Sequence, residues 1–336
     1  MDRFGLGWRD DLAAGIFANL DRIDIVEVLA DDYADACKAR LRALRTLAIQ
    51  VPVTLHGVSL GLASTESVEP HRLDALARVV NAVQPAAWSE HFAFVRGGGV
   101  EIGHLAAPPR NAATIEGAGR NADRAARIVG SRPLLENVAT LIDPPASDRD
   151  EATWLAQAQR ATRCDLLLDL HNLHANATNF GFDAMEFLDA IPLQRVRQVH
   201  LAGGKWIVRS GVRRLLDDHQ HDVPDSVYAL LREVASRAAD LDVILERDGA
   251  YPGMDALLAQ LDRARCAVAE GRERRRAATQ PAVGSPGPSG AGLEAELARL
   301  YRGEARACVE IGDAVGLAMA VESFRRKRAS TRAAHR

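Results

Sequence analysis

Acidic and imidazole side chains recur at the ends of short apolar segments along this chain. Each segment has the length of a β-strand, and runs such as DLLLDL at Asp165–Leu170 and DVILE at Asp242–Glu246 are typical of strands buried on both faces. Parallel strands of a closed barrel end on one rim, so this pattern predicts that residues far apart in sequence meet at a single opening. The residues at these strand ends are Glu27, His56, Glu90, His91, Glu136, Asp169, His200 and Glu246.

Strand candidates and amphipathic segments alternate along most of the chain. The order predicts a βα-repeated parallel sheet, and eight repeats favour a closed (β/α)8 TIM barrel over an open sheet. The first strand is short and Gly-rich, which suits a barrel in which the backbone makes way for a ligand. The predicted strands are Phe4–Trp8, Ile23–Leu29, Val51–His56, Ala87–Phe92, Pro133–Asn137, Asp165–Leu170, Val196–Leu201 and Asp242–Glu246. The predicted helices are Tyr33–Leu47, His71–Val83, Ala118–Val129, Glu151–Ala161, Ala184–Ile191 and Ser226–Ala239.

The composition changes after about Glu270. Residues 271–292 run through RERRR into QPAVGSPGPSGAG, which is rich in Pro, Gly, Ser and Ala and predicts a flexible linker. Apolar residues return at helical spacing from Leu293 to Val321, so residues 293–336 are expected to form a helical tail that packs or contacts a partner. The barrel is therefore predicted to span residues 1–270.

The composition suits one large globular domain with an appendage, because 47% of the 336 residues are hydrophobic and 26% are charged. A net charge of -3 gives no general attraction to nucleic acid or anionic membranes, and neither is expected as a partner. The cysteines Cys37, Cys164, Cys266 and Cys308 form no C-x-x-C pair, which argues against a disulfide framework and a thiolate zinc site. Their wide spacing fits a reducing cytoplasm, and no apolar stretch reaches the length of a membrane span.

Imidazole and carboxylate groups together form the ligand set of iron, manganese or zinc in catalytic sites. Further candidates, Asp217 and His219, lie in the long connection after the seventh strand. Carboxylates gathered in a partly desolvated pocket repel one another unless cations neutralise them. Taken singly, a strand-end His is commonly a hydrogen-bonded structural residue, and an Asp there often caps the next helix. The joint pattern favours a metal site with more than one ion.

Nine blocks of the sequence match one known family in the same order. The chain resembles the multinuclear non-haem iron-dependent oxidative enzymes, barrel proteins whose best-known member is the catalytic subunit of methanobactin biosynthesis. The blocks are GLGWR (Gly5–Arg9), VEVLADDY (Val26–Tyr33), VPVTLHGVSLGLAS (Val51–Ser64), SEH (Ser89–His91), LLENVAT (Leu134–Thr140), LLLDLHNLHANATNFG (Leu166–Gly181), VHLAG (Val199–Gly203), DDH (Asp217–His219) and LERD (Leu245–Asp248).

The resemblance implies a TIM barrel that holds two or three iron ions in mixed Fe2+ and Fe3+ states and uses O2 as co-substrate. Its members oxidatively modify a ribosomally made precursor peptide, commonly at cysteine and in some cases at a C-terminal aspartate. A small partner protein that binds the leader peptide generally assists them. The iron ligands implied here are His56, His91, Glu136, Asp169, Asn172, His200, Asp217, His219 and Glu246.

The chain departs from the family pattern at several positions. His171 stands where many members have Asn, and His174 stands where an aromatic residue is frequent. Either is interpreted as an extra ligand or a catalytic base, and the pair is hypothesised to relay protons, since neutral imidazole works near pH 7. Asp31 replaces a Glu of the family, and Glu27 is interpreted as a hydrogen-bonding residue outside the ligand set.

Two other classes fit parts of the pattern. Barrels of the xylose isomerase and endonuclease IV type use carboxylates and imidazoles at the same rim for sugar isomerisation or phosphodiester cleavage. A metal-storage protein or scaffold would present the same ligands without turnover. Oxygen uptake in the presence of a peptide substrate separates the three classes.

Overall fold

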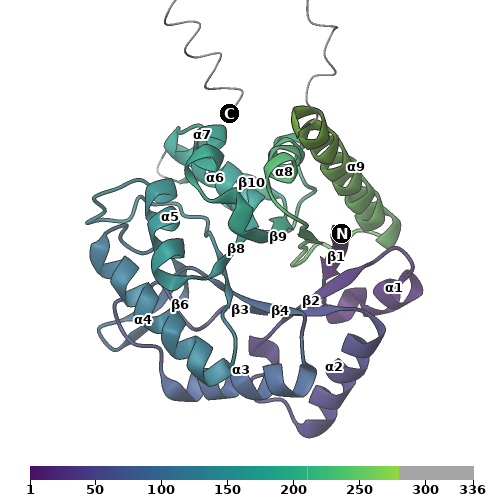
Figure 1. Cartoon of the computed structure of the whole chain (residues 1–336), viewed down its shortest axis with the longest axis horizontal. Coiled ribbons are helices and arrows are strands. Elements are labelled where there is room, and N and C mark those ends of the chain that lie inside the picture. The colour runs from purple at the N-terminus through teal and green to yellow at the C-terminus, as the bar shows by residue number, and fades with distance from the viewer. Residues whose placement is uncertain (210, 280–336) are drawn as a thin grey trace, which may run out of the picture. The chain divides into compact units, whose positions relative to one another are not determined.

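The computed structural model describes residues 1–209 and 211–279, and its strands form a closed parallel barrel (Figure 1). The strands follow one another around the barrel in the order β1-β12-β9-β8-β7-β4-β3-β2. The predicted (β/α)8 barrel is confirmed, and the short Gly-rich first segment is one of its strands. The barrel strands are β1 (Arg3–Gly7), β2 (Ile25–Leu29), β3 (Val53–Gly57), β4 (Ala87–His91), β7 (Leu134–Glu136), β8 (Asp165–Asp169), β9 (Val196–Leu201) and β12 (Asp242–Leu245).

Helices surround the barrel and bury the outer faces of its strands (Figure 1). The strands are therefore buried on both faces, and every residue of β3, including His56, is buried. The helices are α1 (Ala13–Ala18), α2 (Lys38–Gln50), α3 (Pro70–Val83), α4 (Ala112–Val129), α5 (Glu151–Thr162), α6 (Leu170–Phe180), α7 (Ala184–Ala190), α8 (Asp225–Arg237) and α9 (Met254–Thr279). Short 3-10 turns occupy Asp10–Leu12, Asp31–Tyr33 and Leu193–Arg195.

Side-chain caps explain where the helix predictions were displaced. Helix α4 begins at Ala112 rather than at the predicted Ala118, because the Asn111 side chain accepts a hydrogen bond of 3.2 Å from the Thr114 amide. Helix α6 was not predicted, because its apolar residues continue the pattern of the preceding strand. The Asp169 carboxylate ends β8 and caps α6 by accepting a hydrogen bond of 2.6 Å from the Asn172 amide.

Two antiparallel hairpins extend from strand ends and were not predicted. The first pairs β5 (Phe94–Gly97) with β6 (Val100–Ala106) after β4. The second pairs β10 (Gly204–Arg209) with β11 (Val212–Asp217) after β9. Because β11 ends at Asp217, this second hairpin returns the chain from β9 to the barrel opening.

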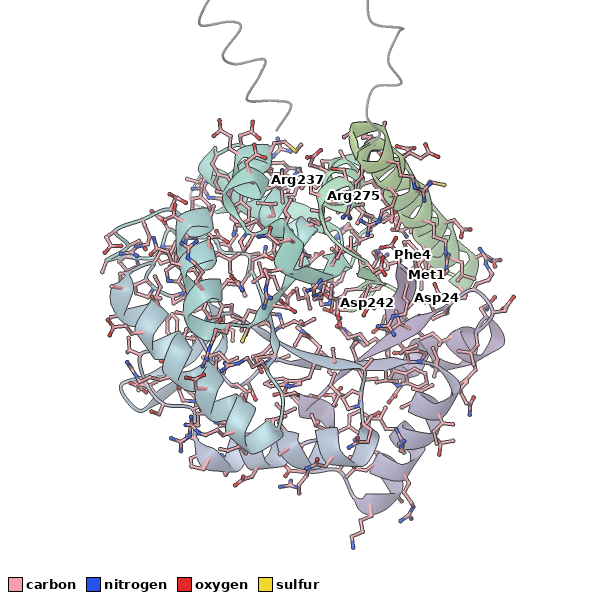
Figure 2. The ribbon with its side chains drawn as sticks, viewed as in Figure 1. Met1, Phe4, Asp24, Arg237, Asp242 and Arg275 are labelled. Atoms are coloured by element: carbon pink, nitrogen blue, oxygen red, sulfur yellow. The ribbon has the colours of Figure 1, made fainter. Side chains whose placement is uncertain are left out.

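The first and last strands close the barrel through charged and backbone contacts. Arg3 of β1 pairs with Asp242 of β12 at 2.6 Å, and the Phe4 amide donates to Asp24 at 2.9 Å; Figure 2 labels Phe4, Asp24 and Asp242 in this region. A Cβ atom at Gly5 would lie 1.7 Å from the backbone oxygen of Ile25. The glycine of the first strand thus makes way for β2, rather than for a ligand as predicted.

Helix α9 continues through the start of the predicted linker. Arg272 donates hydrogen bonds to the carbonyl oxygens of Ala235 and Ala238 at 2.6 and 2.7 Å, so this part of α9 is packed against the compact unit Met1–Ala277. The remainder of the predicted linker, 280–292, and the predicted tail, 293–336, lie outside the described residues. Across the described part of the chain, no helix combines the length and apolar character needed to cross a membrane.

Candidate metal centre

Strand register brings the predicted residues to one end of the barrel. His91, the last residue of β4, lies beside Glu136 of β7, and Asp169 of β8 lies beside His200 of β9. His56 is the fourth of the five residues in β3, and Glu246 directly follows β12. The carboxyl ends of parallel strands share one rim, so the side chains converge although they come from six different strands.

The first group of possible ligands consists of His56, His91 and Glu136. The Nε2 atoms of His56 and His91 lie 3.2 and 3.4 Å from Oε2 of Glu136. The other ring nitrogen of His56 lies 2.8 Å from the Ser89 hydroxyl, and that of His91 lies 3.1 Å from the Gly57 carbonyl. These outer contacts orient the Nε2 atoms toward Glu136, as expected for imidazoles that bind a metal.

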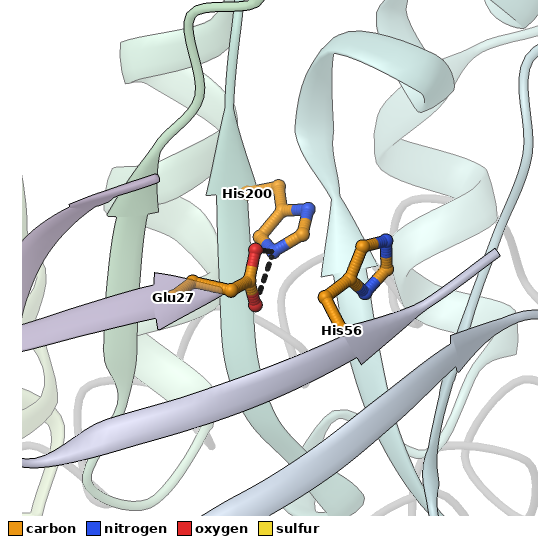
Figure 3. A group of neighbouring side chains, drawn as sticks. All are labelled: Glu27, His56 and His200. Carbon is orange, nitrogen blue, oxygen red and sulfur yellow. Dashed lines mark hydrogen bonds and ion pairs between the residues drawn. The ribbon is translucent and has the colours of Figure 1, made fainter. Parts of the chain in front are cut away.

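The second group joins Glu27 to His56 and His200, and Figure 3 shows the three side chains pointing toward one another. Oε1 of Glu27 lies 2.9 Å from Nε2 of His200. Gln198 donates a hydrogen bond to the other oxygen of the Glu27 carboxylate. Glu27 thus both orients His200 and belongs to a group that can hold an ion, whereas the sequence interpretation gave it only the first role.

The third group contains the carboxylates of Glu136, Asp169 and Glu246 together with His200. Nδ1 of His200 lies 3.2 Å from Glu136 and 3.0 Å from Glu246. Glu136 belongs to the first and third groups, and His200 belongs to the second and third. Shared members of this kind are what neighbouring ions with bridging ligands require.

Asp217 and His219 extend the third group along the rim. Nε2 of His219 lies 2.9 Å from Asp217, and its Nδ1 lies 3.3 Å from Glu246 and 3.1 Å from Asp248. His171 contacts the opposite oxygen of Asp217 through Nδ1 at 2.6 Å. The predicted ligands Asp217 and His219 therefore lie beside the cluster, and His171 orients Asp217.

Asn172 lies next to the third group on the first turn of α6. Its side-chain Nδ2 donates to the Asn137 carbonyl at 3.0 Å, and the Nδ2 of Asn137 in turn donates to the Asp169 carbonyl at 2.9 Å. Among the described residues, the buried Oδ1 of Asn172 finds no hydrogen-bond donor. That oxygen is available to a cation, and the asparagine pair fixes its position.

His174 lies farther along α6, outside the three groups. Its ring centroid is 6.2 Å from that of His171, and its Nε2 lies 3.2 Å from the Ser226 hydroxyl on α8. Burial and the neighbouring His171 lower the pKa of His174 below its usual value. A neutral imidazole between the cluster and an exposed serine is suited to proton transfer.

Neighbouring charges and burial shift the pKa values of the ionisable groups of the cluster in different directions. Burial disfavours a charged His200, but surrounding carboxylates, chiefly Glu246, outweigh burial and raise the pKa of His200 well above its usual value. Burial is likewise outweighed at Glu136, where the nearby imidazoles lower the carboxyl pKa to about 2. Burial and the charge of Asp217 instead raise the pKa of Asp169 well above its usual range. Positive charge therefore stabilises the cluster, and protonated histidines or metal ions can supply it.

The positions of the ligand atoms fit metal ions better than hydrogen bonds alone. Oε2 of Glu136 and Oδ2 of Asp169 are buried and have no hydrogen-bond partner within the described part of the chain. Both ring nitrogens of His219 lie near carboxylates without hydrogen-bond geometry. A spacing of about 3 Å suits either a hydrogen bond or two ligands of one ion, so the unpartnered oxygens rather than the distances favour metal ions here.

Most of the candidate residues expected from the sequence meet at this centre. His56, His91, Glu136, Asp169, His200 and Glu246 belong to the three groups, whereas Asn172, Asp217 and His219 border them. The sequence also marked Glu27 as an acidic residue of an apolar segment, but Glu27 lies in the middle of β2 and not at its end like the other candidate ligands. The sequence gave no indication of the roles of Ser89 and Asn137, because their contacts with His56 and Asp169 depend on the register between strands.

Comparison with known proteins shows the family to which the chain is related. A family model described as "RiPP precursor modification enzyme MbnB/TglH/ChrH" matches residues 3–269. A UPF0276 protein of Caulobacter vibrioides (strain NA1000 / CB15N) is 33% identical over 272 residues, which cover 81% of this chain and 96% of that protein.

Solved structures share the barrel at low sequence identity. A xylose isomerase domain containing protein from Salmonella typhimurium LT2 is 18% identical with a TM-score of 0.52, and the match covers 80% of this chain and 97% of that one. The IolI protein with a binding zinc atom is 12% identical with a TM-score of 0.50, covering 81% and 99% of the two chains. At these identities the likeness shows the fold alone.

Replacing Glu136 tests whether the groups share ligands. We expect Glu136→Gln to lose about two metal equivalents, because the residue belongs to two groups, and Glu27→Gln to lose about one. Metal content is measured by mass spectrometry on protein purified without air. The exposed carboxylate Glu116 gives a matched control, since Glu116→Gln should leave the metal content unchanged. Full metal content in Glu136→Gln would contradict shared ligation.

Proposed function

We propose a function on the premise that this chain belongs to the family of RiPP precursor modification enzymes MbnB/TglH/ChrH. The protein is an iron- and O2-dependent enzyme that oxidises a ribosomally synthesised precursor peptide at a cysteine or a C-terminal aspartate. The observation that carries the proposal is the set of three overlapping imidazole and carboxylate groups at one barrel opening. Because the groups share residues, ions held in them would be neighbours, and a set of imidazole and carboxylate ligands suits iron.

The three overlapping groups would hold the ions, with Glu136 shared by the first and third groups. Asp217, His219 and Asn172 would add ligands beside the third group. Iron held there would supply electron transfer to O2 and would polarise a peptide thiol or carboxyl group. The protein contributes the fixed positions of the ligands. Buried second contacts, such as Ser89 to His56 and Gln198 to Glu27, keep the ligand atoms oriented without substrate present.

His171 and His174 provide the proton path in this proposal. Asp217 holds His171 through Nδ1, and His174 lies one helical turn further along α6, in contact with the exposed Ser226. Proton transfer from the substrate would pass along this helix face toward solvent. The lowered pKa of His174 keeps its imidazole neutral, and a neutral imidazole can accept a proton near pH 7.

The peptide and a partner protein complete the proposed system. A small leader-peptide-binding protein would deliver the precursor, and the tail at residues 293–336 is the proposed contact for it. This tail lies outside the described residues, so its role rests on the sequence pattern alone.

The direct test is oxygen uptake coupled to a change in peptide mass. Iron-loaded protein is mixed with O2 and a co-expressed precursor peptide, and we expect O2 consumption together with a mass change confined to one residue. Manganese- or zinc-loaded protein is the control and should leave the peptide unchanged. Peptide that keeps its mass under all three metals, with sugar isomerisation or phosphodiester cleavage instead, would move the protein to the rival class.

His174→Ala tests the proton path. We expect turnover to fall at least about 100-fold while iron content stays unchanged, because the side chain lies outside the ligand groups. The matched control is Ser226→Ala, which removes only the outer hydroxyl and should cost less. Full turnover by the double variant His171→Ala and His174→Ala would refute the relay.

Truncation after Thr279 tests the partner contact. The cut leaves α9 intact, including Arg272 and its anchoring bonds to α8 and the segment after it. We expect the shortened protein to keep its iron and its thermal stability but to lose partner binding, measured by co-purification. Undiminished co-purification of the partner would place the contact on the barrel instead.

A further inference from the structure

A pocket of about 220 Å³ lies beside the candidate metal centre, between helix α3 and the segments that follow β2 and β3. The metal site does not use it. Its walls include Ala30, Ala34, Leu60, Ala75 and Leu76, and its polar groups include Asp31, Asp35 and Glu90. Because the loops that line it follow barrel strands, the pocket is at the same end of the barrel as the cluster.

Glu90 forms the buried end of this pocket. It precedes His91 on β4, and adjacent strand residues point to opposite faces, so Glu90 points away from the face that carries the His91 imidazole. The Glu90 side chain is 1% exposed. A Cβ atom at position 57 would lie 2.3 Å from Oε2 of Glu90, so only a glycine there leaves room for the carboxylate.

The buried carboxyl group of Glu90 lacks hydrogen-bond partners. Counting the described residues only, neither of its buried oxygens has a hydrogen-bond partner of good geometry, although the Leu60 amide lies close enough to act on it. Buried polar groups are normally satisfied, and leaving one unsatisfied costs about 1–3 kcal/mol. A bound molecule with N–H groups would meet this need.

The charge of the pocket selects a cation. Three carboxylates line it, whereas Arg72 of the lining is directed to carboxylates beyond the pocket, at 2.7 Å from Glu69 and 2.5 Å from Glu101. Arg96 lies near Glu90 but is similarly engaged, with Glu101 at 2.8 Å and the Ser59 carbonyl at 2.7 Å. Burial and the charge of Asp31 raise the pKa of Glu90 well above its usual range despite the nearby Arg96, so these arginines leave the acids of the pocket short of positive charge.

The volume and the apolar walls of the pocket indicate what kind of cation fits it. Cavities of roughly 150 Å³ accept a small organic molecule such as benzene, so 220 Å³ exceeds what a bare metal ion needs. Alanine and leucine side chains form the walls, and the carboxylate lies at the closed end. An aliphatic stem that ends in an ammonium or guanidinium group matches both features.

We propose that this pocket binds a lysine or arginine side chain of the peptide substrate and thereby selects peptides with a basic residue near the modified position. The inference rests on the proposed function for the identity of the substrate. The binding chemistry itself follows from Glu90, Asp31 and the apolar walls, and needs neither iron nor turnover.

The test compares two peptides that differ only in charge. Ac-Ala-Arg-Ala-amide and Ac-Ala-citrulline-Ala-amide are titrated into the full-length, metal-loaded protein, and affinity is measured by calorimetry. We expect the arginine peptide to bind at least about tenfold more tightly than the citrulline peptide. Equal binding of the two peptides, or binding of neither, would overturn the proposal.

Substitutions in and near the pocket test whether the arginine peptide binds there. Glu90→Gln should weaken arginine-peptide binding at least about tenfold, whereas Asp32→Asn, at the exposed neighbour of Asp31, should not change it. Because Glu90→Gln alters a buried group, Ala75→Leu serves as a second variant that fills the pocket from α3 and should block binding. Unchanged binding in Ala75→Leu would overturn the assignment.

Two further outcomes separate this inference from the proposed function. Mg2+ that displaces the arginine peptide would indicate a site for small cations and would overturn the proposal. Selective arginine binding in a protein that leaves every precursor peptide unmodified would uphold the pocket while refuting the oxidative function.

Discussion

Repulsion among carboxylates buried at one barrel opening is the interaction on which this structure depends. Glu27, Glu136, Asp169 and Glu246 are each at most 5% exposed, and their charges have little water to screen them. Imidazoles lie among them, and the raised pKa of His200 shows how strongly the cluster attracts positive charge. Imidazole nitrogens bind metal ions only when deprotonated, so metal ions at this candidate centre would compete with protons for the same atoms.

The barrel tolerates this repulsion because the candidate ligands lie on strands that are hydrogen-bonded to one another. Glu136 and His91 are register neighbours, and so are Asp169 and His200. The side-chain amides of Asn137 and Asn172 also tie the ends of β7 and β8 to the first turn of α6. Ligand positions are thus fixed by backbone pairing, which holds them more precisely than loops would.

The sequence predicted the barrel and its converging residues because both follow from local patterns. Apolar segments of strand length mark the strands, and His56, His91, Glu136, Asp169, His200 and Glu246 mark their ends. The prediction was less complete where one segment changes from strand to helix within a residue. At Asp169 the carboxylate ends β8, caps α6 and joins the candidate site, so the continuous apolar pattern concealed the helix that carries His171 and His174.

By itself the sequence determined the parallel barrel, the chemistry of its opening and the family to which the chain belongs. These depend on residue type and on spacing along the chain, which are visible without coordinates. Only the tertiary structure decided that Glu27 joins His56 and His200, that Gly5 makes room for β2, and that Glu90 faces a separate pocket. Each of those facts depends on which strands are neighbours and on the face to which a side chain points, and a shift of register by one residue would reverse them.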